Sequence, residues 1–168
     1  MKMIPLLLQL CMIVMFPACK KADPVTPVVP ATSFFAKGAD VSWLTEMEAS
    51  GVSFYDAGGT QTDCMLLLKN LGLNTIRLRV WVNPANGWCN KADVVSKAIR
   101  AKSLGMKLLI NFHYSDSWAD PGQQTKPAAW SAFNISGLET AVHNHTIEVM
   151  DSLKLNGSAS LAGGRLRR

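Results

Sequence analysis

The feature that most constrains the fold of this 168-residue chain is a regular alternation of strand patterns and helix patterns from about residue 35 onward. The clearest strand patterns are the alternating segment 74–82 and the nearly continuous apolar run 107–114, which is typical of a parallel strand covered on both faces. Strands that alternate with helices predict a parallel α/β fold. We expect strands at 38–42, 74–82 and 107–114, and helices at 63–71, 92–104 and 137–155.

Two parallel α/β architectures fit this order, an open doubly wound sheet and a (β/α)8 barrel. A dinucleotide-binding sheet needs a glycine-rich turn after its first strand, and the pair Gly58-Gly59 opens no such pattern. A barrel carries functional side chains at the carboxyl ends of successive strands, and about 250 residues are typical of the whole fold. We therefore predict the N-terminal part of a barrel, about three βα units. The three strand ends carry Asp40, then Arg79 with Trp81, and then His113 with Asp116.

Residue spacing predicts which side of each element is buried. In the strand 74–82, Leu78 and Val80 should face the covering helices, which turns Arg79 toward the barrel interior. Because an unpaired buried charge is costly, Arg79 needs a carboxylate or a substrate hydroxyl, or else forms a buried salt bridge that only supports the fold. The expected apolar faces are Cys64, Leu67, Leu68 and Leu71 on the first helix, and Leu138, Val142, His145, Val149 and Leu153 on the third.

The loop after the third strand is dense in polar and aromatic side chains, which suits polysaccharide binding. Sugars offer hydroxyl groups for hydrogen bonds and apolar C–H faces that stack on aromatic rings. Asn111 and His113 bring polar groups to the interior of the strand end. Trp118 is the candidate stacking platform, with Trp81 and Trp130 behind it. The alternative for each tryptophan is a packing role in the core.

Charge and cysteine content argue against several other functions. The net charge of +5 comes from scattered basic residues without interleaved aromatics, which makes a nucleic-acid partner a poor interpretation. The sequence has no phosphate-binding loop and no His/Cys cluster, so we expect no cofactor and no metal, and a cofactor-dependent oxidoreductase ranks last. Cys64 and Cys89 could pair in an exported protein or remain free thiols.

Several longer segments occur in an order that makes the sequence recognisable: 38–42 (GADVS), 76–81 (IRLRVW), 112–116 (FHYSD), 118–122 (WADPG), and Ala141-Val142 with His145-Thr146. Over about residues 35–155 the chain resembles the endo-β-1,4-galactanases of glycoside hydrolase family 53. The resemblance implies a partial (β/α)8 barrel and cleavage of galactan or arabinogalactan with retention, by two glutamates. It further implies that Arg79 and His113 line the sugar subsite next to the cleaved bond, and that the substrate-facing loop holds Asp116, Trp118 and Asp120.

The sequence departs from the family pattern at the catalytic residues. The family places one glutamate after an Asn at the end of the fourth strand and the other at the end of the seventh, and we expect both positions to lie beyond the chain end. The glutamates present are Glu46, Glu48, Glu139 and Glu148, and none follows a fourth strand. The glycine-rich, basic segment 156–168 reads as an aberrant tail. We therefore expect an inactive chain, with a non-catalytic carbohydrate-binding remnant as the alternative.

The first 34 residues read as an export signal followed by a spacer. The apolar stretch 6–16 is typical of a signal peptide, here 1–19, and is too short to span a bilayer. Phe16-Pro17-Ala18-Cys19 resembles a bacterial lipobox, so we expect a lipid anchor at Cys19, with an ordinary signal peptide as the alternative. The proline-rich linker 20–34 would hold a domain off the membrane. We expect a bacterial outer-membrane or cell-surface lipoprotein, or otherwise a periplasmic or secreted protein.

Overall fold

The computed structural model describes residues 34–156. The chain divides into two units, and the fold below is that of the second unit, which begins at Phe35. The signal peptide, Cys19, the linker 20–33 and the tail 157–168 lie outside the described residues. Within the described part of the chain, no helix is long and apolar enough to cross a membrane.

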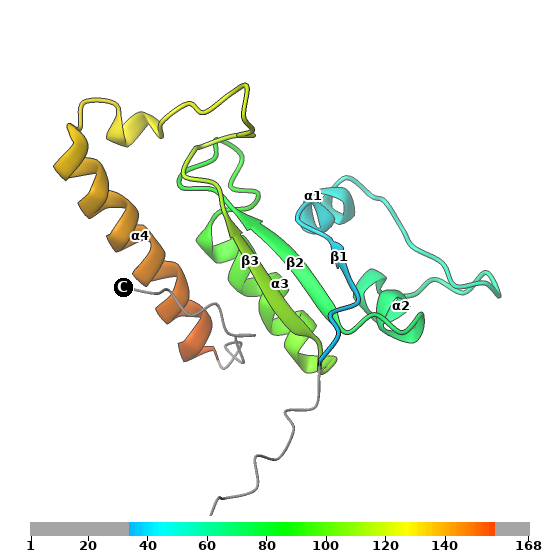
Figure 1. Cartoon of the computed structure of the whole chain (residues 1–168). Coiled ribbons are helices and arrows are strands. Elements are labelled where there is room, and N and C mark those ends of the chain that lie inside the picture. The colour runs from blue at the N-terminus through cyan, green and yellow to red at the C-terminus, as the bar shows by residue number, and fades with distance from the viewer. Residues whose placement is uncertain (1–33, 157–168) are drawn as a thin grey trace, which may run out of the picture. The chain divides into compact units, whose positions relative to one another are not determined.

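Three parallel strands form the sheet, in the order β1-β2-β3 (Figure 1). They are β1 (Gly38–Asp40), β2 (Thr75–Val80) and β3 (Lys107–Phe112), each inside a segment that the sequence predicts as a strand. In the register of the sheet, Arg77 lies beside Asp40 on one side and Leu109 on the other. The carboxyl ends of all three strands therefore meet at one edge of the sheet, which confirms the parallel α/β prediction.

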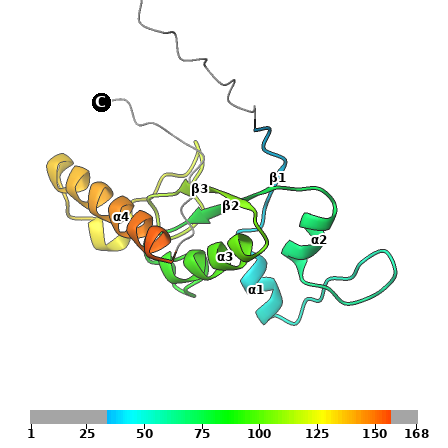
Figure 2. The same cartoon turned by 90° about the horizontal axis from the view of Figure 1, so that it is seen from below.

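Helices follow each strand. Asp63, Asn90 and Asn134 cap three of them, each accepting a hydrogen bond from a backbone N–H of the first turn, as side chains at this position commonly do. Helix α3 packs against β2 and β3 and contacts α4, so both lie on one face of the sheet (Figure 2). The helices are α1 (Leu44–Ala49), α2 (Cys64–Asn70), α3 (Lys91–Ser103) and α4 (Ile135–Leu155), with a short 3-10 helix at Ala128–Trp130. Sequence patterns did not predict α1 or the 3-10 helix, because neither spans two full turns.

The core lies between the sheet and its covering helices. Ile76, Leu78 and Val80 project from β2 into this core, as the alternation predicted. Val94 and Ala98 of α3 pack against them, and the other buried members are Leu44, Met65, Ala101, Met106, Leu108, Val149 and Leu153. The opposite face of the sheet is open in the described region, since Leu109 of β3 is 54% exposed. That open face carries the polar side chains described below.

Helix α2 buries only part of the face that the sequence predicted. Leu71 is 76% exposed and lies at the C-terminal cap, where the helix has already ended. The buried residue of α2 is Met65, and Cys64 and Leu68 pack only partly against the core. The segment 64–68 is apolar at every position, so spacing alone cannot select a face in so short a helix.

Replacing Met65 with alanine should lower the free energy of unfolding by about 2–5 kcal/mol, because it opens a cavity in a closed core. Leu71→Ala should change it by less than about 0.5 kcal/mol, because the side chain is already in solvent. Urea unfolding followed by far-ultraviolet circular dichroism measures both. A larger loss in Leu71→Ala than in Met65→Ala would mean that α2 buries the other face.

Candidate functional site

The centre of the candidate site is Arg79, which lies on β2 with only 2% of its surface exposed. Its guanidinium carbon lies 4.3 Å from the ring centre of Trp43, 4.4 Å from that of Trp81 and 5.2 Å from that of Trp118. These distances are those of cation–π contacts, which are strongest when the cation is desolvated. We call Arg79 and these three tryptophans the arginine cage.

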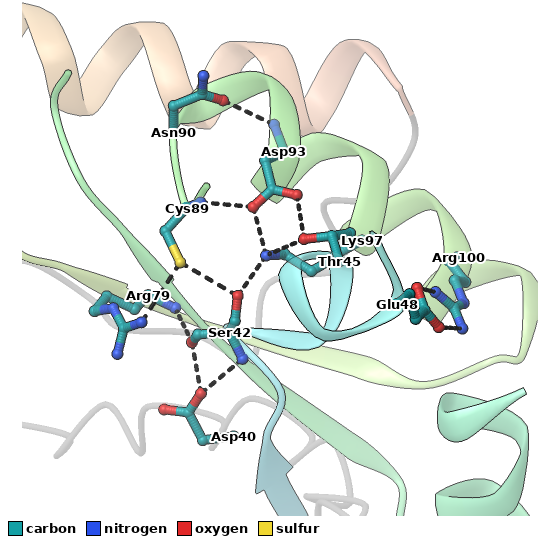
Figure 3. Close-up of polar contacts among 10 residues, drawn as sticks. All are labelled: Asp40, Ser42, Thr45, Glu48, Arg79, Cys89, Asn90, Asp93, Lys97 and Arg100. Atoms are coloured by element: carbon teal, nitrogen blue, oxygen red, sulfur yellow. Dashed lines mark hydrogen bonds and ion pairs between the residues drawn. The ribbon is translucent and has the colours of Figure 1, made fainter. Parts of the chain in front are cut away.

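Arg79 is not held by an acidic side chain. None of the ion pairs found within residues 34–156 includes Arg79, so the buried salt bridge expected as an alternative is not observed there. The guanidinium Nη2 donates a hydrogen bond to Cys89 Sγ at 3.5 Å (Figure 3), while Nε is buried without a partner in the described region. The aromatic faces are therefore the main compensation for this charge.

Trp43 is the site residue that sequence reasoning missed. It follows Ser42 directly, at the end of the segment predicted as the first strand, and it caps the N-terminus of α1. The available signal was its place at a strand end, equivalent to that of Trp81 after β2. Trp43 and Trp118 stack with ring centres 6.1 Å apart and an interplanar angle of 18°, and both rings are about half exposed. Part of each residue is therefore open to solvent.

Asp40 lies at the end of β1 and pairs with Arg77 of the neighbouring strand. Its Oδ1 accepts hydrogen bonds from the Ser42 backbone N at 2.9 Å and from Ser42 Oγ at 2.5 Å. Burial by itself would raise the pKa of Asp40, but the hydrogen bonds from Ser42 and the charge of Arg77 outweigh it and lower that pKa. Asp40 is therefore ionised and shares the edge of the sheet with the cage.

His113 lies just beyond the end of β3, with its ring 5.7 Å from that of Trp118 in an edge-on arrangement. Its Nε2 is 2.8 Å from Asn111 Nδ2, and Nδ1 is buried without a partner among the described residues. With the Asn111 amide assigned this way, Nε2 accepts and the ring proton is on Nδ1. Burial, and then the charge of Arg79, lower the pKa of His113, so the imidazole is neutral at pH 7.

Asp120 fixes the orientation of Trp118. The indole Nε1 of Trp118 donates to Asp120 Oδ2 at 3.0 Å, and Asp120 Oδ1 accepts from the backbone N of Gly122 and of Gln123. The hydrogen bond from Gly122, followed by that from Trp118, lowers the pKa of Asp120. Because Asp120 closes its own turn while it holds the indole, the exposed ring of Trp118 is set in place before any ligand arrives.

Asp116 and Trp130 lie apart from the cage. Asp116 accepts hydrogen bonds from the backbone N of Asn83 at 2.9 Å and of Ala128 at 2.8 Å, so it joins two loops. Trp130 is nearly buried and packs against Tyr114 and His145, with ring centres 6.4 and 6.1 Å away. The expectation that Trp130 supports Trp118 is therefore wrong, because the 3-10 helix turns its ring toward α4.

The remaining chemistry of the described region is structural. Cys64 and Cys89 are both free thiols, which decides between the two alternatives left open for them. The described residues contain no group of acidic, histidine or cysteine side chains that could hold a metal. Glu48 forms a bidentate ion pair with Arg100, with N–O distances of 2.6 and 2.8 Å, and Glu148 forms an ion pair with Lys91. What the edge of the sheet offers is an aromatic surface ringed by polar groups, which is the chemistry of carbohydrate recognition.

Comparison with known proteins agrees with this chemistry. The model of glycosyl hydrolase family 53 matches residues 36–160. The chain belongs to this family. It is 39% identical over 123 residues to arabinogalactan endo-β-1,4-galactanase A of Emericella nidulans, and 38% identical over 131 residues to endo-β-1,4-galactanase of Bacillus subtilis. Each match covers 73% of this chain, but 35% and 30% of the respective relative.

The fold matches the family as well. The structure superposes on the family 53 catalytic domain of Ignisphaera aggregans with a TM-score of 0.71 and 35% identity, over 79% of this chain and 39% of that domain. The three parallel βα units are thus the N-terminal part of a family 53 (β/α)8 barrel, as the sequence predicted. The chain spans about a third of the length of the curated relatives that it matches.

His113 should titrate below its ordinary pKa of 6.5. Above pH 6.5 the ring is neutral in both folded and unfolded chains and adds no pH dependence. As the pH falls below 6.5 the unfolded chain takes up the proton first, so stability should fall until the pH passes the pKa of the folded state. NMR titration of the imidazole resonances, assigned with His113→Gln, measures the pKa. The variant should also show a shallower loss of stability in this pH range, and a His113 pKa above 6.5 would contradict the burial described here.

Proposed function

We propose that the arginine cage and its surroundings form part of the substrate site of an endo-acting β-1,4-galactanase. The observation that carries the proposal is the stacked pair Trp43 and Trp118, about half exposed beside Arg79. A ring pair of this kind can stack on the apolar C–H face of a galactose unit. Aromatic rings that are open to solvent, unlike rings in a closed pocket, can also meet a sugar in the middle of a polymer. Family relatives named as galactanases support galactan or arabinogalactan as the substrate.

Polar groups at the same edge would orient the sugar. Asp40 is ionised and can accept hydrogen bonds from hydroxyl groups, while the Nδ1–H of His113 and the Nε–H of Arg79 have no partner among the described residues. A sugar hydroxyl that reached either donor after a small movement of the cage would satisfy it. We assign Arg79 and His113 to the sugar unit next to the cleaved bond. Trp81 acts with them through its contact with Arg79.

Cleavage with retention requires two carboxyl groups roughly 5 Å apart across the scissile bond. Glu46 and Glu48 lie on α1, and Glu139 and Glu148 lie on α4. Two of these four carboxylates are held by Arg100 and Lys91 on helix α3. We therefore propose that these 168 residues, taken alone, bind galactan without cleaving it. Non-catalytic carbohydrate binding is thus the second candidate function, and the same tryptophan pair supports it.

Trp118→Ala should clearly weaken retardation of the chain in a native gel that contains β-1,4-galactan, because it removes one ring of the stacked pair and one wall of the arginine cage. Stacking of a nucleic-acid base on one aromatic ring is worth about 1–3 kcal/mol, and a stacking loss of this order would weaken binding by roughly tenfold. Affinity electrophoresis of the wild type and the variant, with and without the polymer, measures this.

Tyr55→Ala is the matched control, since Tyr55 is also an exposed aromatic residue but lies on the loop between α1 and α2. It should migrate as the wild type does. Wild-type mobility that is the same with and without galactan would reject the binding proposal. Release of reducing sugar from β-1,4-galactan by the purified chain, above a blank, would reject the proposal that these residues alone do not cleave.

We also propose that the chain is exported and anchored by a lipid at Cys19. The support is the sequence alone, namely the apolar stretch 6–16, the small residue Ala18 before Cys19, and the proline-rich segment that follows. A galactan-binding domain held at a bacterial surface would meet a polymer that is too large to enter the cell. One lipid chain binds a membrane only weakly, so stable anchoring would need a second chain or another signal.

Cys19→Ser should abolish incorporation of labelled palmitate when the chain is expressed in a bacterial host, because the thiol is the acceptor. Cys11→Ser is the matched control, since Cys11 lies in the same leader, and it should be labelled as the wild type is. Labelling is read from gels of whole cells and of membrane fractions. Equal labelling of Cys19→Ser and the wild type would contradict the anchor, and export without labelling would point to an ordinary signal peptide.

A further inference from the structure

Lys97 is fully buried on helix α3, with 0% of its surface exposed. Its ammonium group donates to Asp93 Oδ2 at 2.6 Å, to the backbone O of Ser42 at 2.6 Å and to Thr45 Oγ1 at 3.3 Å (Figure 3). A lysine ammonium has three donors, so all of them are used. A buried lysine is rare because desolvation of its charge is costly, and here the cost is offset only by this set of partners.

Both carboxylate oxygens of Asp93, the partner of Lys97, also accept hydrogen bonds from other groups. Its Oδ2 also accepts from the backbone N of Cys89 at 2.6 Å, and its Oδ1 accepts from Thr45 Oγ1 at 2.6 Å. The pair therefore joins α3 to the loop after β1 through Ser42, to the start of α1 through Thr45, and to the loop after β2 through Cys89. Neither Asp93 nor Lys97 lies in the arginine cage.

Ser42 and Cys89, which the pair holds, are the residues that hold Arg79. Ser42 Oγ accepts from the backbone N of Arg79 at 2.8 Å, and Cys89 Sγ accepts from its guanidinium. Cys89 O also accepts from the backbone N of Trp81 at 2.8 Å, and Cys89 Sγ donates to Ser42 O at 3.2 Å. Cys89 has a φ of +63°, which is unusual for a residue with a side chain and needs surrounding contacts to maintain it.

We propose that Asp93 and Lys97 are positioning residues of the sugar site, which hold the loops after β1 and β2 so that Trp43 and Trp81 close on Arg79. Trp43 is the residue after Ser42, whose carbonyl accepts from the ammonium. Loss of that bond frees the loop that carries Trp43. Loss of the hydrogen bond between Asp93 and the backbone N of Cys89 frees Cys89, which accepts hydrogen bonds from Arg79 and from the backbone N of Trp81. The inference rests on the proposed function only where it concerns sugar affinity.

The test uses the whole chain with 5-fluorotryptophan incorporated, so that each tryptophan gives its own ¹⁹F resonance, assigned by single Trp→Phe variants. The main variant combines Asp93→Asn and Lys97→Met, which removes both charges together and leaves no isolated buried charge. We expect the resonances of Trp43 and Trp81 to shift or broaden. The Trp130 resonance should stay in place, because Trp130 packs on the α4 side of the molecule.

Lys91→Met is the matched control, since it removes an ion pair from the same helix at an exposed position facing Glu148. It should leave every tryptophan resonance and galactan retardation unchanged. Thr45→Val is a milder variant that keeps both charges and removes only the hydroxyl that bridges them. It should move the resonances of Trp43 and Trp81 in the same direction by a smaller amount, and it serves if the double variant does not fold.

Galactan affinity of the folded double variant should fall by about tenfold or more, because a binding site works only while its side chains are held within about 0.5 Å of the productive geometry. Unchanged Trp43 and Trp81 resonances in a variant whose melting temperature has fallen would overturn the proposal, since the pair would then be purely structural. Resonance shifts without any galactan binding by the wild type would reject the proposed function but leave the positioning role intact. Equal shifts of all five tryptophans, Trp130 included, would also overturn it.

Discussion

The buried guanidinium of Arg79 is the constraint on which the site depends. A desolvated cation without a carboxylate among the described residues is tolerable only if aromatic faces and a thiol surround it. The three rings come from three places in the sequence: Trp43 follows β1, Trp81 follows β2 and Trp118 follows β3. They converge because parallel strands in register end at one edge of the sheet. The cage is therefore a direct product of parallel topology.

The polar residues at this edge of the sheet and in the loop after β3 have two kinds of role. Asp116 and Asp120 accept hydrogen bonds from loop backbone, and Asp120 also from the Trp118 indole. They therefore fix the conformation of the loops beside the site. Asp40 and His113 lie at the edge of the sheet beside the aromatic rings, and His113 keeps a donor without a partner in the described region. On the face of the sheet that α3 covers, the pair Asp93 and Lys97 binds the loops that follow β1 and β2. The galactan site that we propose needs walls that are held in place before the ligand binds, and this arrangement of fixed and open polar groups would supply them.

Much of the fold could be predicted from the sequence, and the failures are local. The strands were recognised because alternation and apolar runs are strong over six residues, and Arg79 was placed correctly because its neighbours Leu78 and Val80 are buried on the other face. Helix α1 was missed because six residues carry little periodicity. The face of α2 was only partly predicted, because every position of its apolar run 64–68 is apolar and spacing cannot choose among them. Lys97 reads as an ordinary charged helix residue in sequence, whereas in the fold it is buried.

The sequence by itself determined the parallel α/β order, the strand ends that carry Asp40, Arg79 and His113, and the resemblance to a galactanase barrel, because these depend on local periodicity and on motifs read along the chain. Only the tertiary structure decided which groups compensate the buried charge of Arg79. It also decided that Trp43 lies in the candidate site while Trp130 lies outside it, and that residues of α3 contact the loops of the cage. Those outcomes depend on which side chains meet across strands 30 or more residues apart. Such meetings follow from sheet register and helix packing, which no local pattern encodes.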